Sequence, residues 1–166
     1  MKPATKGPKT NAMRVLDAHH VAYQVHYYSP EVHSADEVAR IVDAAPTQVF
    51  KTLVLSESGS GRPLLVMVPA NAELDLKLLA QQPGVGEKRL RMATQREAES
   101  LTGLLVGGIS PLALLQKGFR VFIDDSVLQL DRVYVSGGQR GVNLSLAAAD
   151  LLKVTRAVPV AAASPL

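Results

Sequence analysis

Hydrophobic residues recur along this chain at two spacings, one typical of helices and one typical of strands. The clearest helical stretch contains Val38, Ile41 and Val42, and it follows Ser34 and Glu37, which have the spacing of a capping box. Helical spacing of apolar residues marks the other helices, and alternation or short apolar runs mark the strands. Helices are expected from about residue 11 to 18, 35 to 43, 74 to 82, 95 to 102 and 149 to 154, and strands over 21–28, 49–55, 63–68, 120–123, 130–135 and 143–146.

Length and composition indicate a single globular domain. The chain has 166 residues, of which 47% are hydrophobic, enough to bury a core of ordinary size. Residues 1–9 combine lysines, prolines and a glycine without apolar periodicity, and residues 156–166 are rich in alanine and proline, so both ends are expected to be flexible. The folded domain is therefore expected to span residues 10–155.

The net charge of +3 does not by itself indicate nucleic-acid binding. Three of the 18 basic residues are lysines in the first nine positions, and the remaining basic residues equal the 15 acidic ones in number. A site for RNA must then be a local basic patch. The candidates are the cluster of Lys88, Arg89 and Arg91, and the separate Arg140, although such clusters are more often solvated surface.

The residue types present exclude several classes of site. The sequence contains no cysteine, which excludes disulfides, thiolate zinc sites and a protein thiol nucleophile. The four histidines lack the spacing of zinc-binding helices, so neither a metal nor another cofactor is expected. No apolar run is long enough to cross a bilayer, and the first nine residues lack the apolar block of a signal peptide. A soluble, cytoplasmic protein without a membrane partner is therefore expected.

Lys51 is the most informative single residue. It interrupts a nearly apolar strand, and by alternation it shares a face with Val49, Leu53 and Leu55. Lysine is almost never buried without a partner, so this side chain either extends to the rim of the sheet or points into an open polar cleft. Both placements fit the pattern.

Two glycine-rich turns could present backbone N–H groups to a ligand. In Leu105–Pro111, Gly107 and Gly108 allow close approach of the main chain, and Pro111 restricts the exit from the loop. In Ser136–Gly141, clustered N–H groups and an arginine suit a phosphate group. An ordinary glycine turn or a tight hairpin has the same composition, so each loop also has a purely structural interpretation.

Neither turn contains a recognisable serine nucleophile. Ser110 and Ser136 lie outside the Gly-x-Ser-x-Gly pattern, and no histidine or acidic residue is tied to them by spacing. Both are therefore expected to be turn serines.

Three segments, in this order along the chain, strongly resemble those of the YbaK family of free-standing aminoacyl-tRNA editing proteins. They are Val-Phe-Lys-Thr-Leu-Val at 49–54, Leu-Val-Gly-Gly-Ile-Ser-Pro at 105–111 and Val-Ser-Gly-Gly-Gln-Arg-Gly at 135–141. The similarity extends over most of the chain, from about residue 10 to residue 154. Each segment alone is a weak signal, whereas the combination is specific.

The resemblance implies both a fold and a function. The implied fold is a single α/β (α+β) domain with a mixed, barrel-like sheet flanked by helices, shared with the editing domain inserted in some bacterial prolyl-tRNA synthetases. The implied function is removal of cysteine wrongly attached to tRNA(Pro), since the Gly-Gly-Ile-Ser-Pro form resembles the cysteine-specific branch more than the alanine-specific one. The implied partner is the acceptor end of tRNA(Pro), with prolyl-tRNA synthetase as a further candidate.

The family motifs carry over to particular positions of this chain. Catalytic roles fall on Lys51, Gly107 and Gly108: the lysine anchors the terminal phosphate or ribose, or adds positive potential, and the glycine amides meet the negative charge that develops on the ester oxygen. At Asn143 some relatives carry aspartate. Substrate contacts are expected at Tyr28, Phe50, Thr52, Ile109, Ser110, Pro111, Ser136, Gly137, Gly138, Arg140 and Asn143.

The expected mechanism uses the thiol of the substrate, because the chain offers no convincing nucleophile of its own. Following the family precedent, the cysteine sulfur attacks its own ester carbonyl and leaves as a thiolactone. The sequence leaves two alternatives open. One is an Ala-tRNA(Pro) deacylase that uses water, and the other is a non-catalytic module that binds tRNA or the synthetase.

Overall fold

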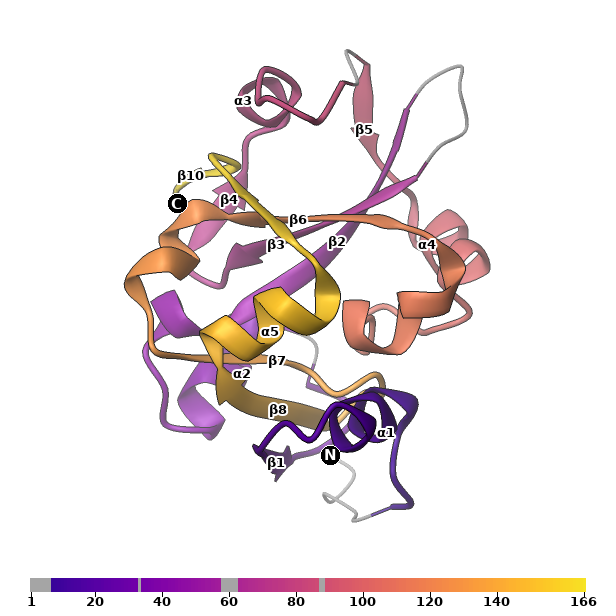
Figure 1. The fold of residues 1–166 in the computed structure, drawn as a ribbon, viewed down its shortest axis with the longest axis vertical. Coiled ribbons are helices and arrows are strands. Elements are labelled where there is room, and N and C mark those ends of the chain that lie inside the picture. Colours follow the sequence, from indigo (N-terminus) through magenta and orange to yellow (C-terminus); the bar gives the residue numbers. More distant parts are fainter. Residues whose placement is uncertain (1–6, 33, 58–62, 87–88) are drawn as a thin grey trace.

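The computed structural model describes residues 7–32, 34–57, 63–86 and 89–166, arranged as shown in Figure 1. Residues 58–62 of the loop between the strands expected at 49–55 and 63–68, residues 1–6 of the expected tail and Lys88 lie outside the described residues. Lys9 forms an ion pair with Asp17 of the first helix. The α-helices are α1 (Asn11–Ala18), α2 (Ala35–Ile41), α3 (Leu76–Ala80), α4 (Gln95–Thr102) and α5 (Ala148–Thr155), and the 3₁₀ helices are η1 (Pro46–Gln48), η2 (Pro111–Lys117) and η3 (Asp125–Gln129). The strands are β1 (Tyr23–Tyr27), β2 (Phe50–Glu57), β3 (Leu64–Pro69), β4 (Ala72–Leu74), β5 (Leu90–Met92), β6 (Arg120–Asp124), β7 (Arg132–Ser136), β8 (Val142–Ala147), β9 (Val158–Val160) and β10 (Ala163–Pro165).

Two sheets form the framework of the molecule. Five strands lie in the order β5-β2-β3-β6-β9, in which β2 is antiparallel to β5 and β3, and β6 is parallel to β3 and β9. Three strands form the antiparallel sheet β1-β8-β7. An isolated parallel bridge between Val49 and Tyr134 connects the two sheets. The expected single α/β domain with mixed strand directions is therefore confirmed.

Local sequence signals explain where α4 begins and ends. Thr94 and Glu97 form a complete capping box, in which each side chain accepts a hydrogen bond from the other residue's backbone N–H. Gly103 ends the helix in the left-handed conformation. Arg91 of β5 donates two hydrogen bonds, of 2.8 and 2.7 Å, to the Glu97 carboxylate. This arginine, a candidate for RNA binding, thus already has an acidic partner that helps to fix α4.

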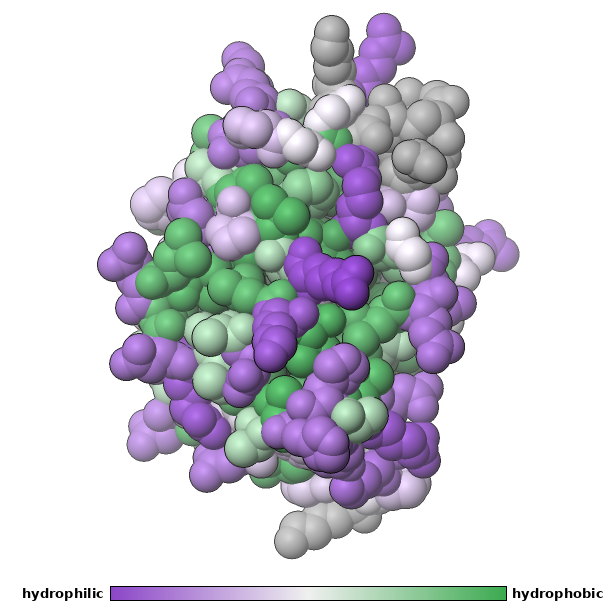
Figure 2. Space-filling model, viewed as in Figure 1, coloured by the Kyte–Doolittle hydropathy of each residue, from purple (hydrophilic) through white to green (hydrophobic). Residues whose placement is uncertain are grey.

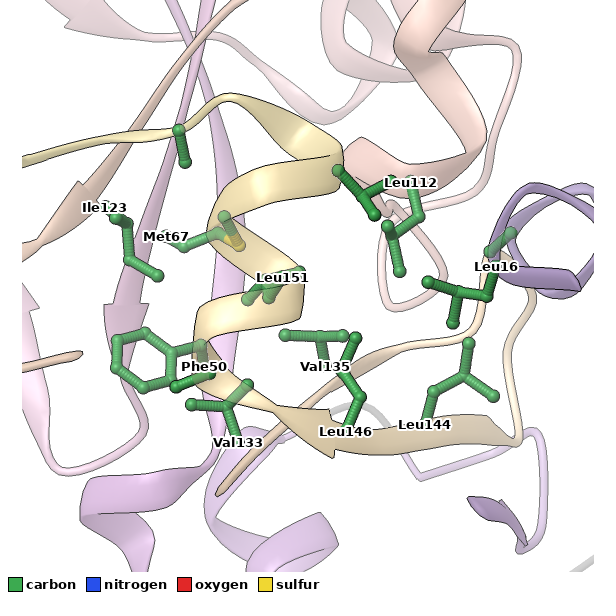
Figure 3. Close-up of a cluster of buried hydrophobic side chains, with 14 of the residues drawn as sticks. Leu16, Phe50, Met67, Leu112, Ile123, Val133, Val135, Leu144, Leu146 and Leu151 are labelled. Carbon is green, nitrogen blue, oxygen red and sulfur yellow. The ribbon is translucent and has the colours of Figure 1, made fainter. Parts of the chain in front are cut away.

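The largest core lies between the three-stranded sheet and the helices α1, α5 and η2 (Figure 3). Leu16 from α1, Leu112 from η2 and Leu151 from α5 are fully buried there, against alternate residues of β7 and β8. Phe50 and Met67 reach the same cluster from the five-stranded sheet. One core therefore stabilises both sheets. On the face seen in Figure 2, hydrophobic side chains are interspersed with hydrophilic ones, as is usual for a solvent-facing surface.

The C-terminal segment, expected to be flexible over 156–166, differs from that expectation. It forms β9, which extends the five-stranded sheet beside β6, and β10, which pairs with β4. The buried carboxylate of Asp124 accepts hydrogen bonds from the backbone N–H groups of Ala162 and Ala163, at 3.1 Å each. Asp124, which lies far from this segment in sequence, helps to order it. The alanine and proline content of the segment therefore does not reveal that it forms strands.

Replacing Leu151 by alanine is expected to lower the free energy of unfolding by about 2 to 5 kcal/mol, because it leaves a cavity at a fully buried position. Leu128→Ala is the matched control. Leu128 is 62% exposed, so its replacement is expected to change that free energy by less than about 0.5 kcal/mol. Urea unfolding followed by circular dichroism measures both variants, and equal losses would contradict this description of the core.

Candidate active site

A cavity of about 410 Å³ opens between β2, the loop that contains Gly107 and the paired ends of β7 and β8. The chain that follows β1, together with the start of α2, closes another side. Ala70, after β3, and the C-terminal Leu166 also line it, so the cavity gathers segments from distant parts of the chain. Eight of the expected site residues line it: Tyr28, Phe50, Lys51, Thr52, Gly107, Ile109, Ser136 and Asn143.

Lys51 lies on β2 opposite Val68 of β3, and its half-buried side chain lines the cavity. Lys51 thus lies beside a cavity whose wall contains both polar and apolar residues. Within the described ranges, no carboxylate forms an ion pair with its ammonium group. Its positive charge is therefore available to an anionic group of a ligand.

The two glycines of the first turn differ in whether their backbone N–H groups are hydrogen-bonded. Gly107 lines the cavity with a φ of 95°, and its N–H has no hydrogen-bond partner among the residues described. The N–H of Gly108 donates to the carbonyl oxygen of Leu105 at 2.8 Å, and Gly108 does not line the cavity. The expected donor role thus differs between the two glycines: the N–H of Gly108 is already bonded within the loop, whereas that of Gly107 is not.

Gly108 is instead a position where two segments of main chain meet. A Cβ atom there would lie 2.8 Å from the backbone nitrogen of Arg140 and 2.9 Å from the carbonyl carbon of Gln139. Gly137, expected to contact substrate, is restricted in a similar way, since a Cβ there would lie 2.6 Å from Val142 Cγ1. Both glycines therefore permit close packing and do not line the cavity wall.

Four other expected contacts also lie outside the cavity wall. Ser110 is fully buried, and its Oγ accepts a hydrogen bond from the backbone N–H of Leu112 at 3.2 Å, which caps η2. Pro111 is the first residue of η2, a position that suits its fixed φ. Gly138 and Arg140 line a separate hollow next to the loop. None of these four residues lines the cavity, and contact with substrate at their positions stays a prediction.

Two buried polar atoms at the cavity wall, Thr52 Oγ1 and Asn143 Oδ1, have no hydrogen-bond partner in the described part of the chain. Asn143 is only 3% exposed. An unpaired buried polar group costs about 1 to 3 kcal/mol, so a ligand that hydrogen-bonds to these atoms would recover that free energy. Ser136 differs, because its Oγ accepts from the N–H of Gly138 at 3.1 Å.

Tyr28 holds the end of β1 against the second glycine turn. Its backbone N–H donates to the carbonyl oxygen of Gly141 at 3.0 Å. Burial raises the pKa of its hydroxyl to about 12, so the group stays neutral near pH 7. The apolar wall beside it consists of Val32, Val38, Val49 and Ala70, none of which is among the expected site residues.

Glu99 of α4, which is not among the residues expected from the sequence, contacts the loop. Its Oε2 accepts a hydrogen bond from the backbone N–H of Val106 at 2.9 Å. No spacing rule links an acidic residue of a helix to a loop beyond the helix end, so no sequence signal was available. Across the described ranges, no group of three or more His, Asp or Glu side chains is placed to hold a metal ion, and no helix has the length and hydropathy needed to cross a membrane.

The amino-acid sequence is similar to those of proteins that act on aminoacyl-tRNA. The model of the aminoacyl-tRNA editing domain matches residues 29–154. A protein of Enterococcus faecalis with the provisional name Cys-tRNA(Pro)/Cys-tRNA(Cys) deacylase is 36% identical over 149 residues, which cover 89% of this chain and 88% of that protein. A proline–tRNA ligase of Staphylococcus saprophyticus is 26% identical over 117 residues, which cover 70% of this chain and 19% of the ligase.

Solved structures show the same fold. A protein provisionally described as a trans-editing enzyme for prolyl-tRNA synthetase superposes with a TM-score of 0.78 at 26% identity, covering 95% of this chain and 99% of that one. A hypothetical protein superposes with a TM-score of 0.82 at 22% identity, covering 93% of this chain and 100% of that one. The domain match and the Enterococcus relative show that the chain belongs to the aminoacyl-tRNA editing domain family and is an enzyme of the aminoacyl-tRNA deacylase class.

Proposed function

We propose that this protein cleaves the ester of Cys-tRNA(Pro) and so removes cysteine from a tRNA meant for proline. The observation that carries the proposal is one cavity that gathers Lys51, the unpaired N–H of Gly107 and the unpaired oxygens of Thr52 and Asn143. A cation, a donor and two acceptors suit the phosphate, the ester carbonyl and the α-ammonium group of an aminoacylated adenosine. The 36% identity to a protein provisionally named as a deacylase of this substrate supports the choice of amino acid.

The proposed catalytic groups stabilise negative charge on the substrate. Lys51 holds the terminal phosphate or ribose, or adds positive potential, and acts as a cation without serving as a base. The N–H of Gly107 donates to the ester carbonyl oxygen as negative charge develops there. In other hydrolases the loss of one such donor costs about 3 to 4 kcal/mol of transition-state stabilisation.

The proposed nucleophile is the thiol of the substrate. The chain has no cysteine, and the hydroxyl of Ser136 at the cavity wall is engaged by the N–H of Gly138. The cysteine sulfur attacks its own ester carbonyl carbon, the bond from that carbon to the ribose oxygen breaks, and the ribose oxygen takes the thiol proton. The products are tRNA with a free hydroxyl and a strained cysteine thiolactone.

The proposed partner is the acceptor end of tRNA(Pro), with prolyl-tRNA synthetase as a second partner. The similarity to a segment that makes up 19% of a proline–tRNA ligase supports editing on behalf of that enzyme. Because aminoacyl-tRNA is made and used in translation, the cytoplasm is the proposed location.

Purified protein is expected to deacylate Cys-tRNA(Pro) and to leave Ser-tRNA(Pro) and Ala-tRNA(Pro) intact, because neither serine nor alanine carries a thiol. Release of labelled amino acid from each ester, with heat-treated protein as the control, measures this. Release of alanine alone would show a deacylase that uses water. Release from none of the three esters, with binding of tRNA retained, would show a non-catalytic module.

Lys51→Ala is expected to lower kcat/KM for Cys-tRNA(Pro) by about 100-fold, because it removes the positive charge from the cavity. The matched control is Lys153→Ala, which removes an exposed lysine of α5 that does not line the cavity. Steady-state deacylation rates measure both changes. Wild-type rates in Lys51→Ala would remove this lysine from the mechanism.

Asn143→Leu is expected to raise KM for Cys-tRNA(Pro) by about tenfold, because Asn143 is proposed to accept a hydrogen bond from the α-ammonium group. N-acetyl-Cys-tRNA(Pro), which lacks that ammonium group, is expected to show no such change. Asn11→Leu, at an exposed position of α1, serves as the control. An equal effect of Asn143→Leu on both esters would contradict the assignment.

A further inference from the structure

The loop that carries the donor contains a type II β-turn over Leu105–Gly108. The N–H of Gly108 donates to the carbonyl oxygen of Leu105 at 2.8 Å and closes the turn. Gly107, the third residue, has a φ of 95°, whereas Val106, the second, is not among the residues with positive φ. A positive φ at the third residue alone distinguishes type II from the other common turns, and it favours glycine there.

Two charged side chains hold both backbone groups of Val106. Arg140 Nε donates to its carbonyl oxygen at 2.7 Å, and Glu99 Oε2 accepts from its N–H at 2.9 Å. Hydrogen bonds to charged partners are shorter and stronger than those between neutral groups. The second residue of the turn is therefore fixed from two elements, α4 and the turn that follows β7.

The contact with Arg140 determines the direction of the Gly107 N–H. The carbonyl of Val106 and the N–H of Gly107 belong to the same planar trans peptide, so they point in opposite directions. Because the oxygen is held toward Arg140, the N–H points away from it. Arg140 lines the separate hollow, whereas Val106 and Gly107 line the cavity, so the N–H points away from Arg140 and belongs to a residue of the cavity wall.

The second glycine turn provides a rigid base for this contact. A Cβ atom at Gly108 would lie 2.8 Å from the nitrogen of Arg140 and 3.0 Å from the Cα of Gln139, so the two turns touch without a side chain between them. Ser136 Oγ accepts from the N–H of Gly138 at 3.1 Å and stabilises the turn internally. The backbone of Arg140 is therefore packed against the loop, and from there its side chain reaches Val106.

We propose that Arg140 and Glu99 are positioning residues that keep the Val106–Gly107 peptide turned so that the Gly107 N–H faces the ester oxygen. The competing type I turn rotates this peptide by close to half a turn and would present a carbonyl oxygen to the developing negative charge. Holding the donor in place before substrate binds avoids its reorganisation during the reaction. This inference rests on the proposed deacylase function.

Steady-state kinetics on Cys-tRNA(Pro) test the proposal. Arg140→Ala and Glu99→Ala are each expected to lower kcat by about tenfold or more with KM unchanged. Glu99→Gln keeps an acceptor for the Val106 N–H and is expected to restore most of the rate. The matched control is Arg120→Ala, because Arg120 also donates to a backbone carbonyl oxygen, that of Val85 at 2.6 Å, but does not line the cavity. A raised KM with unchanged kcat in Arg140→Ala would overturn the proposal and assign this arginine to phosphate binding.

Nuclear Overhauser measurements give a readout that does not depend on activity. The Hα of Val106 lies close to the amide proton of Gly107 in a type II turn, and a type I turn separates them. The cross-peak is expected to be strong in the wild type and in Arg120→Ala, and weaker in Arg140→Ala. If the wild type fails to deacylate the ester, the proposed function fails while the cross-peak still tests the turn. A cross-peak of wild-type strength in Arg140→Ala would overturn the inference.

Gly107→Ala tests whether Arg140 acts through this peptide. Alanine rarely adopts a φ of 95°, so the turn is expected to change type and kcat to fall. In that background, Arg140→Ala is expected to lower kcat no further, because the peptide that it holds has already turned. A further tenfold loss would show that Arg140 acts on something else and would overturn the proposal.

Discussion

The close contact between the two glycine turns is the constraint on which the rest of the site depends. Only glycine at position 108 lets the first turn approach the backbone of Gln139 and Arg140, at 2.8 to 3.0 Å from where a Cβ atom would stand. From that approach the Arg140 side chain reaches the carbonyl oxygen of Val106. A loop that presents an amide donor must be held without occupying that donor. Here the preceding residue takes the supporting hydrogen bonds, and the N–H of Gly107 is left for a ligand.

Lys51 reaches the same cavity because of how the two sheets are joined. The bridge between Val49 and Tyr134 places the start of β2 beside β7, whose last residue, Ser136, opens the second glycine turn. The core that both sheets share, to which Phe50 contributes from β2, stabilises this arrangement. The separation between the cation and the amide donor is therefore set by packing between sheets, and no flexible loop carries the lysine.

Sequence patterns identified the parts of the site that have a local signal. Lys51 is a charge inside an apolar strand, and paired glycines mark a permissive loop, so both could be found before the fold was known. The different roles of Gly107 and Gly108 could not be predicted, because they depend on contact with the turn at 136–141, much later in the chain. Glu99 is one of several acidic residues along the chain, and only the tertiary contact distinguishes it. The order of the C-terminal strands likewise depends on Asp124, which lies far from them in sequence.

A donor held in advance suits a reaction in which the substrate supplies its own nucleophile. Intramolecular attack can reach effective molarities of about 10⁵ to 10⁸ M, but closing a strained ring forfeits much of this, so stabilising the negative oxygen becomes the task left to the protein. Under the proposed mechanism a prolyl ester in the same cavity would not react, since it has no thiol. The cavity then does not have to separate amino acids by a methylene group, which is worth only about 1 to 3 kcal/mol in binding. Under this proposal the protein has to supply one cation, one fixed N–H and two unpaired acceptors, and a small domain without a nucleophile of its own can hold all four.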